Sequence, residues 1–224
     1  MSLASKVKDF MHFKIDEYIE MHPAVPPASS FRNINVDTLL RVMTKKKYLI
    51  YTKNFEINIV GIRCGEVFTN RFDDLICYFY KGVNGWYFFK NNATTSPGLY
   101  WVDNYENPNG VAIPAEGQYI DCWQLGLHRG QYKALVHTGK MTVYRDFNKD
   151  RKMDLINPQT GLFGINCHRA TANGTSILVD KWSAGCQVHA NSRDYDEFIM
   201  ACDRHEILHR NAFSYTLINR RDLL

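Results

Sequence analysis

The chain has 224 residues, of which 45% are hydrophobic and 22% charged, and its formal net charge is +4 at pH 7. This length suits one substantial core with a short extension, and the composition excludes a largely disordered chain because enough apolar surface is available for burial. The small positive excess is spread along the sequence without an aromatic-rich basic groove, so we expect no nucleic-acid partner.

The first 30 residues predict an arm beside the main domain. Residues 4–22 carry apolar side chains near helical spacing, and the stretch HPAVPPASS at 22–30 ends that helix with three prolines. We therefore divide the chain into an N-terminal helical arm with a proline-rich linker, 1–30, and one domain, 31–224. The start has no apolar segment of signal-peptide length, and no run of about 18 apolar residues could cross a membrane. These patterns predict synthesis in the cytoplasm and no membrane partner.

The domain is predicted to be mainly β. Residues 35–48 have the pattern of a capped helix, and 48–63 are rich in β-branched and aromatic residues. A second helix is expected at 191–205, capped by Asn191 or Ser192, with Tyr195, Phe198, Ile199 and Cys202 on one face. A strand is expected at 213–219. Further strand-like runs, separated by turn residues, occur at 75–90, 96–104, 107–128, 132–148 and 163–170. This order favours an antiparallel barrel or sandwich with a few flanking helices over alternating βαβ units.

One cysteine is set apart by its neighbours. The six cysteines show no paired spacing, which fits reduced thiols. Cys186 alone follows Ser-Ala-Gly, small residues that let the backbone approach another segment and leave the sulfur uncrowded. A nucleophile is presented in this way, although a tight turn between two strands has the same composition.

A histidine that could activate this thiol lies upstream, in the predicted strand FGINCHRA. Strand alternation places Gly164, Asn166 and His168 on one face, and Ile165 and Cys167 on the other. His168 is therefore the candidate base, whereas Cys167 is expected to be buried as a small hydrophobe.

The residues His168, Ser183, Gly185 and Cys186 together resemble the signature of the L,D-transpeptidase catalytic domain. The cysteine follows the histidine by 18 positions, as in that family. The resemblance covers residues 110–190 and implies a related fold of β-sandwich or barrel type for the domain.

Three positions depart from the family signature. Arg169 stands where the family has glycine, Ala184 where it has a second histidine, and Val188 where it has arginine or asparagine. These replacements remove polar groups of the family's peptide site and keep the nucleophile and the base. The pattern GINCHRA with WSAGCQV also resembles relatives encoded by bacteriophages and phage-like injection systems. That variant implies action at the bacterial cell wall after lysis or delivery by such a device, with the N-terminal arm as a contact to a structural partner.

The resemblance implies acyl transfer on the peptide stems of peptidoglycan, without a cofactor or a metal. Cys186 would be the nucleophile, His168 its base and a carbonyl near Arg169 the group that orients the imidazole, while the turn with Ser183 and Gly185 would supply oxyanion donors from the amides of Gly185 and Cys186. We expect a stem-peptide hydrolase of endopeptidase or carboxypeptidase type. Two alternatives stay open: an L,D-transpeptidase that forms or exchanges cross-links, and a non-catalytic wall-binding or virion structural module.

Other residues are candidates for the substrate groove or for a metal site. A calcium-type loop from Asp146 to Asp154 lacks the glycine and the glutamate of such loops, so a solvated hairpin loop is favoured. Zinc would need His128 and Cys122 with two further histidines, and their spacing is not that of a zinc site. The candidates for contacts with the substrate are Trp182, Tyr144, His137, His189 and Asn166.

Overall fold

A computed structural model describes residues 31, 33–148 and 150–224. The chain divides into two units, Met1–Arg32 and Asn33–Leu224, of which the second contains nearly all of the described residues. The predicted arm and its proline-rich linker lie outside the described residues. In the part of the chain that is described, no helix is long and apolar enough to span a bilayer.

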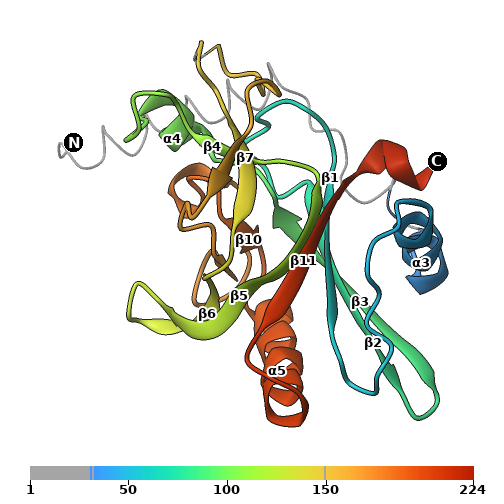
Figure 1. The fold of residues 1–224 in the computed structure, drawn as a ribbon. Coiled ribbons are helices and arrows are strands. Elements are labelled where there is room, and N and C mark those ends of the chain that lie inside the picture. The colour runs from blue at the N-terminus through green and yellow to red at the C-terminus, as the bar shows by residue number, and fades with distance from the viewer. Residues whose placement is uncertain (1–30, 32, 149) are drawn as a thin grey trace. The chain divides into compact units, whose positions relative to one another are not determined.

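The second unit is mainly β and is built around a closed barrel of eight strands (Figure 1). Its strands are β1 Asn58–Arg63, β2 Asp74–Gly82, β3 Gly85–Thr94, β5 Gly117–His128, β6 Tyr132–His137, β9 Cys167–Arg169, β10 Gln187–His189 and β11 Phe213–Asn219. Their order around the barrel is β1-β11-β5-β6-β9-β10-β3-β2, in which only the β1–β11 and β9–β10 pairs are parallel among the described strands. A separate sheet of order β4-β7-β8 contains β4 Ala112–Pro114, β7 Met141–Arg145 and β8 Gln159–Gly161.

Among the described residues, three α-helices and two 3₁₀ turns flank these strands (Figure 1). The helices are α3 Val36–Lys45, α4 Leu99–Asp103 and α5 Ser192–Leu208, and the 3₁₀ turns are η1 Asp180–Trp182 and η2 Arg220–Leu223. The predicted mainly β domain with a few helices is confirmed.

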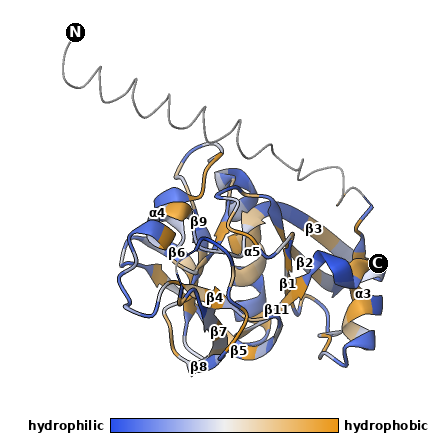
Figure 2. Ribbon diagram, turned by 90° about the horizontal axis from the view of Figure 1, so that it is seen from above, coloured by the Kyte–Doolittle hydropathy of each residue, from blue (hydrophilic) through white to orange (hydrophobic). Residues whose placement is uncertain are grey.

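The helix caps follow directly from the sequence. The Asn35 side chain accepts a hydrogen bond from the Thr38 amide at the start of α3. This helix buries Leu39, Val42 and Met43, and both apolar and polar residues are coloured along it in Figure 2. Asn191 caps α5 by accepting from the Arg193 and Asp194 amides, so the predicted cap is confirmed. The helical face predicted at 191–205 is also confirmed: its buried apolar residues are Tyr195, Phe198, Ile199 and Cys202.

The main core lies inside the barrel and beneath α5. Trp123 of β5 and Tyr215 of β11 are fully buried with ring centroids 4.5 Å apart, and the Trp123 indole donates to the Ile165 carbonyl at 2.7 Å. Phe198 of α5 belongs to the same cluster, so the helix closes the core against the strands.

Three predicted strands are corrected. Residues 96–104 contain α4, whose first amide, that of Leu99, donates to the Asn70 side chain at 3.0 Å, a partner that only the fold supplies. In 48–63, only 58–63 forms a strand. In 163–170, only 167–169 does, because Gly164 has φ +69°, a left-handed conformation that interrupts an extended chain.

Candidate active site

Two adjacent parallel strands bring the two central candidates to the same side of the barrel wall. The register of β9 with β10 pairs His168 with Val188, and Cys186 immediately precedes β10. Because side chains alternate along a strand, Cys186 and His168 fall on one face, whereas Cys167 and Gln187 fall on the other. The alternation expected for His168 and Cys167 is therefore present in the fold.

The turn before Cys186 is shaped by Ser183 and Gly185. The buried Ser183 hydroxyl accepts from the Gly185 amide at 3.1 Å and donates to the Cys186 carbonyl at 2.8 Å. Gly185 has φ +137°, and a Cβ there would lie 2.8 Å from the Ala112 carbonyl oxygen, so only glycine fits. The thiol is left partly exposed, with its sulfur 3.6 Å from the Gly164 carbonyl oxygen.

Residues from another part of the chain anchor this turn. The Asn70 side chain accepts from the Asp180 amide at 2.8 Å and donates to the Asp180 carboxylate at 2.6 Å. The Gly98 amide donates to the Ser183 carbonyl at 2.8 Å, and a Cβ on Gly98 would collide with the Asp180 backbone. The turn that carries Cys186 is thus held by the Asn70 side chain on one side and by the Gly98 backbone on the other.

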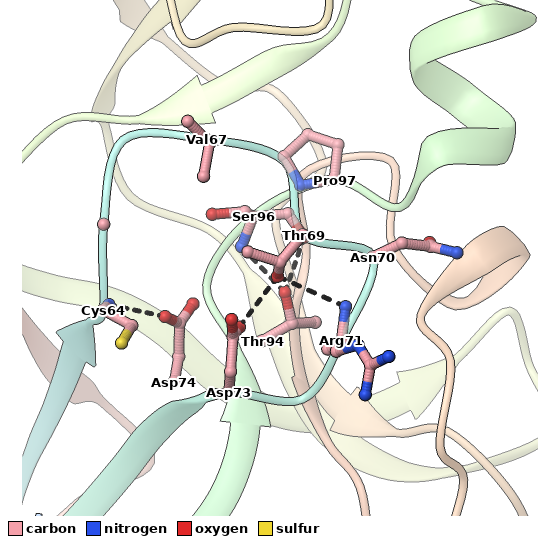
Figure 3. A pocket seen from close by; sticks show the side chains of 11 residues that line it. Cys64, Val67, Thr69, Asn70, Arg71, Asp73, Asp74, Thr94, Ser96 and Pro97 are labelled. Atoms are coloured by element: carbon pink, nitrogen blue, oxygen red, sulfur yellow. Dashed lines mark hydrogen bonds between the residues drawn. The ribbon is translucent and has the colours of Figure 1, made fainter. Parts of the chain in front are cut away.

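Asn70 also borders a small polar pocket, shown in Figure 3. The pocket has a volume of about 10 Å³, which is space for roughly one water molecule. Its buried Asp74 carboxylate accepts from the amides of Cys64 and Thr95 at 2.7 and 2.8 Å. Burial and the neighbouring Asp74 raise the pKa of Asp73 to about 7. This pocket supports the loop that carries Asn70, and it is too small for a peptide.

The His168 ring is oriented by a backbone carbonyl. Its Nδ1 lies 2.8 Å from the Arg169 carbonyl oxygen, where the orienting contact was predicted, and 3.3 Å from the Tyr132 hydroxyl. The ring stacks on His128 with centroids 4.1 Å apart. When Nδ1 carries the proton and donates to this carbonyl, Nε2 has a lone pair with which it can accept a proton.

The electrostatics keep both groups neutral. Burial lowers the pKa of His168 to about 3, helped by the charges of His128 and Arg129 and opposed by the Arg169 and Trp182 carbonyls. Burial raises the pKa of Cys186 to about 11, and an amide contact and a nearby guanidinium only partly offset it. With these pKa values, the resting site near neutral pH holds a thiol and a neutral imidazole.

The predicted oxyanion donors differ in availability. The Gly185 amide already donates to Ser183, so it is engaged within the turn. The Cys186 amide has no hydrogen-bond partner among the residues whose placement is described. One of the two predicted donors is therefore available without rearrangement.

Two of the predicted groove residues have structural contacts. The Asn166 side chain accepts from the His137 amide at 2.9 Å and lies 3.1 Å from His128 Nδ1. His137 Nδ1 accepts from the amides of Phe163 and Ile165 at 3.3 and 3.1 Å. These bonds hold the loop that leads into β9, and Asn166 links that loop to the stacked histidines.

The other three candidates for substrate contact differ in their exposure and in their position relative to the pocket. Trp182 is 43% exposed and directly precedes Ser183, so it remains a candidate for substrate contact. His189 is fully buried in the core beside Cys167, because alternation turns it away from the surface; its predicted substrate contact is wrong. Tyr144 is half-buried and does not line the pocket next to the nucleophile turn, whereas its neighbour Arg145 does.

That pocket has a volume of about 220 Å³ and lies beside the turn of Cys186. Ala184 of the turn lines it, together with Phe163, which precedes the glycine whose carbonyl contacts the Cys186 sulfur. Sequence reasoning did not assign Arg145, Tyr132 or His128 to the site. A signal was present for Arg145: Met141 and Val143 alternate with polar residues in β7, so position 145 faces the core.

The residues considered for metal binding are placed apart or are otherwise engaged. Cys122 lies in the core, and His128 stacks on the candidate base. In the loop after β7, the side chains of Asn148 and Asp150 accept hydrogen bonds from the amides of Asp150 and Lys152. Within the described ranges, no group of three or more His, Cys, Asp or Glu side chains is arranged to hold a metal ion.

Comparison of the chain with protein-family models, with curated proteins and with solved structures gave no match.

Proposed function

We propose that this chain is a cysteine-dependent hydrolase of peptidoglycan stem peptides, with an L,D-transpeptidase-like catalytic domain. The observation that carries the proposal is the placement of Cys186. Its partly exposed sulfur ends a glycine turn next to a pocket, on the same face of the β9–β10 pair as His168. The imidazole is oriented through Nδ1 by a carbonyl, as a general base requires.

The neutral resting pair determines how the chemistry would run. Nε2 of His168 takes the thiol proton as the sulfur attacks the peptide carbonyl, so charge develops only in the transition state. The Cys186 amide donates to the oxyanion. The C–N bond then breaks, His168 returns the proton to the leaving amine, and a thioester remains. Water, deprotonated by His168, attacks the thioester and releases the acid and the thiol.

Purified peptidoglycan provides the test. The full chain is incubated with peptidoglycan, and soluble products are identified by mass spectrometry, with the Cys186→Ala variant as the control. We expect release of stem-peptide fragments or loss of peptide cross-links, and no incorporation of an added D-amino acid. Efficient D-amino acid exchange without net cleavage would assign the site to a transpeptidase. Binding to peptidoglycan with no change in its peptides would assign the domain to wall attachment.

A further inference from the structure

Arg145 is a buried cation without a counter-charge. The residue is only 9% exposed, yet no carboxylate forms an ion pair with it within the described ranges. Among the described residues, its guanidinium makes one hydrogen bond, from Nη1 to the Gly110 carbonyl at 3.1 Å, and its buried Nε has no partner there. Burial lowers the pKa of Arg145. A guanidinium offers five donors, so most of its capacity is unused.

A second buried arginine, Arg63, has its hydrogen-bond donors satisfied by neighbouring protein groups. Arg63 donates from Nε and Nη2 to the Thr95 hydroxyl and carbonyl at 3.1 and 2.9 Å. The carboxylate of the buried Asp74 lies near enough for Arg63 to lower its pKa. The contrast indicates that Arg145, which borders the pocket, has donors available to a group that enters it, including a buried Nε with no protein partner among the described residues.

The position of Arg145 connects it to the nucleophile. Arg145 and Ala112 are paired in the β4–β7 ladder, and the backbone of Ala112 touches Gly185, the residue before Cys186. Because neighbouring strands lie about 5 Å apart, the backbone of Arg145 is one strand spacing from Ala112, the residue that contacts the turn. Arg145 and Ala184 also line the same pocket of about 220 Å³. The guanidinium Cζ lies 5.5 Å from the Phe163 ring centroid, so one side of the group is covered by an aromatic ring.

From this arrangement we propose that Arg145 binds a carboxylate of the peptide substrate in the pocket beside Cys186. An arginine fork matches a carboxylate geometrically and supplies the missing counter-charge. Glu106 also lines the pocket, but it is exposed and makes no ion pair with Arg145 in the described structure, so it leaves the guanidinium available. The inference rests on the proposed function, because it assigns the specificity of that same site. A peptide stem can offer either its C-terminal carboxylate or a side-branch carboxylate.

Binding of matched peptides to the Cys186→Ala full chain tests this without turnover. The first pair is acetyl-L-lysyl-D-alanine and its C-terminal carboxamide. The second pair is acetyl-γ-D-glutamyl-L-lysinamide with its free α-carboxylate, and the same compound with that group amidated. Affinities are measured by backbone amide NMR shifts. Hydrogen bonds to charged groups predict that the acid of one pair binds at least about tenfold more tightly than its amide. The pair that shows this preference identifies the source of the carboxylate.

Substitution then assigns the preference to one residue. Arg145→Gln should lower acid affinity at least about tenfold while amide affinity stays unchanged, and Arg145→Lys should restore part of it. Arg151→Gln is the matched control, because Arg151 is an exposed arginine that pairs with Asp103. It should leave both affinities unchanged.

Two outcomes would overturn the inference. Equal affinities for acid and amide in both pairs do so without any arginine variant, and so does an acid preference that survives Arg145→Gln. Failure of the proposed function is distinguishable from these: the wild-type chain would then leave peptidoglycan uncleaved, while the Arg145-dependent preference for the acid persisted.

Discussion

The two faces of the β9–β10 pair each carry one cysteine and one histidine. On the inner face, the Cys167 sulfur lies 3.6 Å from His189 Nε2, and His189 Nδ1 lies 3.2 Å from the Asn91 side chain. Both members of this inner pair are fully buried. On the outer face, Cys186 is partly exposed beside a pocket, and His168 is oriented by a carbonyl.

The comparison teaches that a short thiol–imidazole distance does not by itself make a reactive site. Burial raises the pKa of Cys167 well above its usual value, and no substrate can reach its sulfur. The outer pair has access, an oriented base and an unengaged amide at Cys186. We therefore propose the outer pair as the reactive one, and the predictions compare it with the inner pair.

The largest difference should appear when each cysteine is removed. Cys186→Ala should lower the rate of peptide cleavage by on the order of 10⁴-fold or more, because no other described group replaces the nucleophile. Cys167→Ala should keep the rate within about threefold and lower the free energy of unfolding by about 1–2 kcal/mol, because it leaves a small void in the core. Cleavage rates and denaturant titrations measure both. Equal activity of the two variants would remove the assignment to the outer face.

The histidines should divide in the same way with a smaller effect. His168→Ala should lower kcat by roughly 10²- to 10⁴-fold through loss of the general base. His189→Gln should leave kcat within about threefold, because His189 touches only core residues in the described structure. Steady-state kinetics on a soluble stem peptide measure kcat for both variants. A strong loss of kcat in a folded His189→Gln variant would give the inner pair a role in the reaction.

Alkylation rates should differ between the two thiols because they differ in accessibility, and the pH dependence should show that the Cys186 thiol is neutral near pH 7. With a pKa of about 11 for Cys186, its labelling by iodoacetamide should rise about tenfold per pH unit from pH 7 to about pH 10, as the thiolate fraction grows. Cys167 should label at least about 100-fold more slowly in the folded chain. Mass spectrometry of labelled peptides follows each site. Rapid labelling of Cys186 that is already constant at pH 7 would contradict the neutral state and indicate a thiolate paired with an imidazolium.

The smallest predicted effect is one that both histidines share. Burial lowers the pKa of His168 and of His189 to about 3, below the ordinary value of 6.5 that applies in the unfolded chain. As pH falls from about 6.5 to about 3, the unfolded state binds a proton at each ring and the folded state does not. Each histidine should therefore lower the free energy of unfolding by about 1.4 kcal/mol per pH unit within that window.

Denaturant titrations across that pH window measure the slope. Replacing either His168 or His189 with glutamine should reduce this slope by about 1.4 kcal/mol per pH unit, the contribution of one proton. Only His168→Gln should impair cleavage. A slope that is unchanged in the folded His189→Gln variant would show that its pKa is not lowered as described.

Local patterns in the sequence were sufficient for the elements that depend on neighbouring residues. Asn191 and the spacing of Tyr195, Phe198 and Cys202 predicted α5 and its buried face, because capping and helical periodicity act within a few turns of chain. The same local logic misread 96–104, where the Asn70 side chain supports a short helix from a distance of 29 positions.

Strand alternation and the small residues before Cys186 were sufficient to predict part of the candidate site. Alternation around His168 separates it from Cys167, and the Ser-Ala-Gly turn marks Cys186. Alternation in β7 places Arg145 on the side of the core, but it does not show that Arg145 lines the pocket, because that pocket is formed by strands and loops from several parts of the chain. The burial of His189 also depended on which residues pack against β10, and not on its proximity to Cys186 in the sequence.

The sequence by itself determined which residues share a face, since the two-residue period of a strand is a property of the backbone. It also placed small residues at 183–185, which mark the turn before Cys186. The need for glycine at 185 follows from its positive φ and the close approach of Ala112, which only the fold shows. Only the tertiary structure decided which face is buried, and with it the protonation states. Desolvation depends on every atom packed around a group, so the neutral Cys186–His168 pair and the uncompensated charge of Arg145 appear only when distant segments meet.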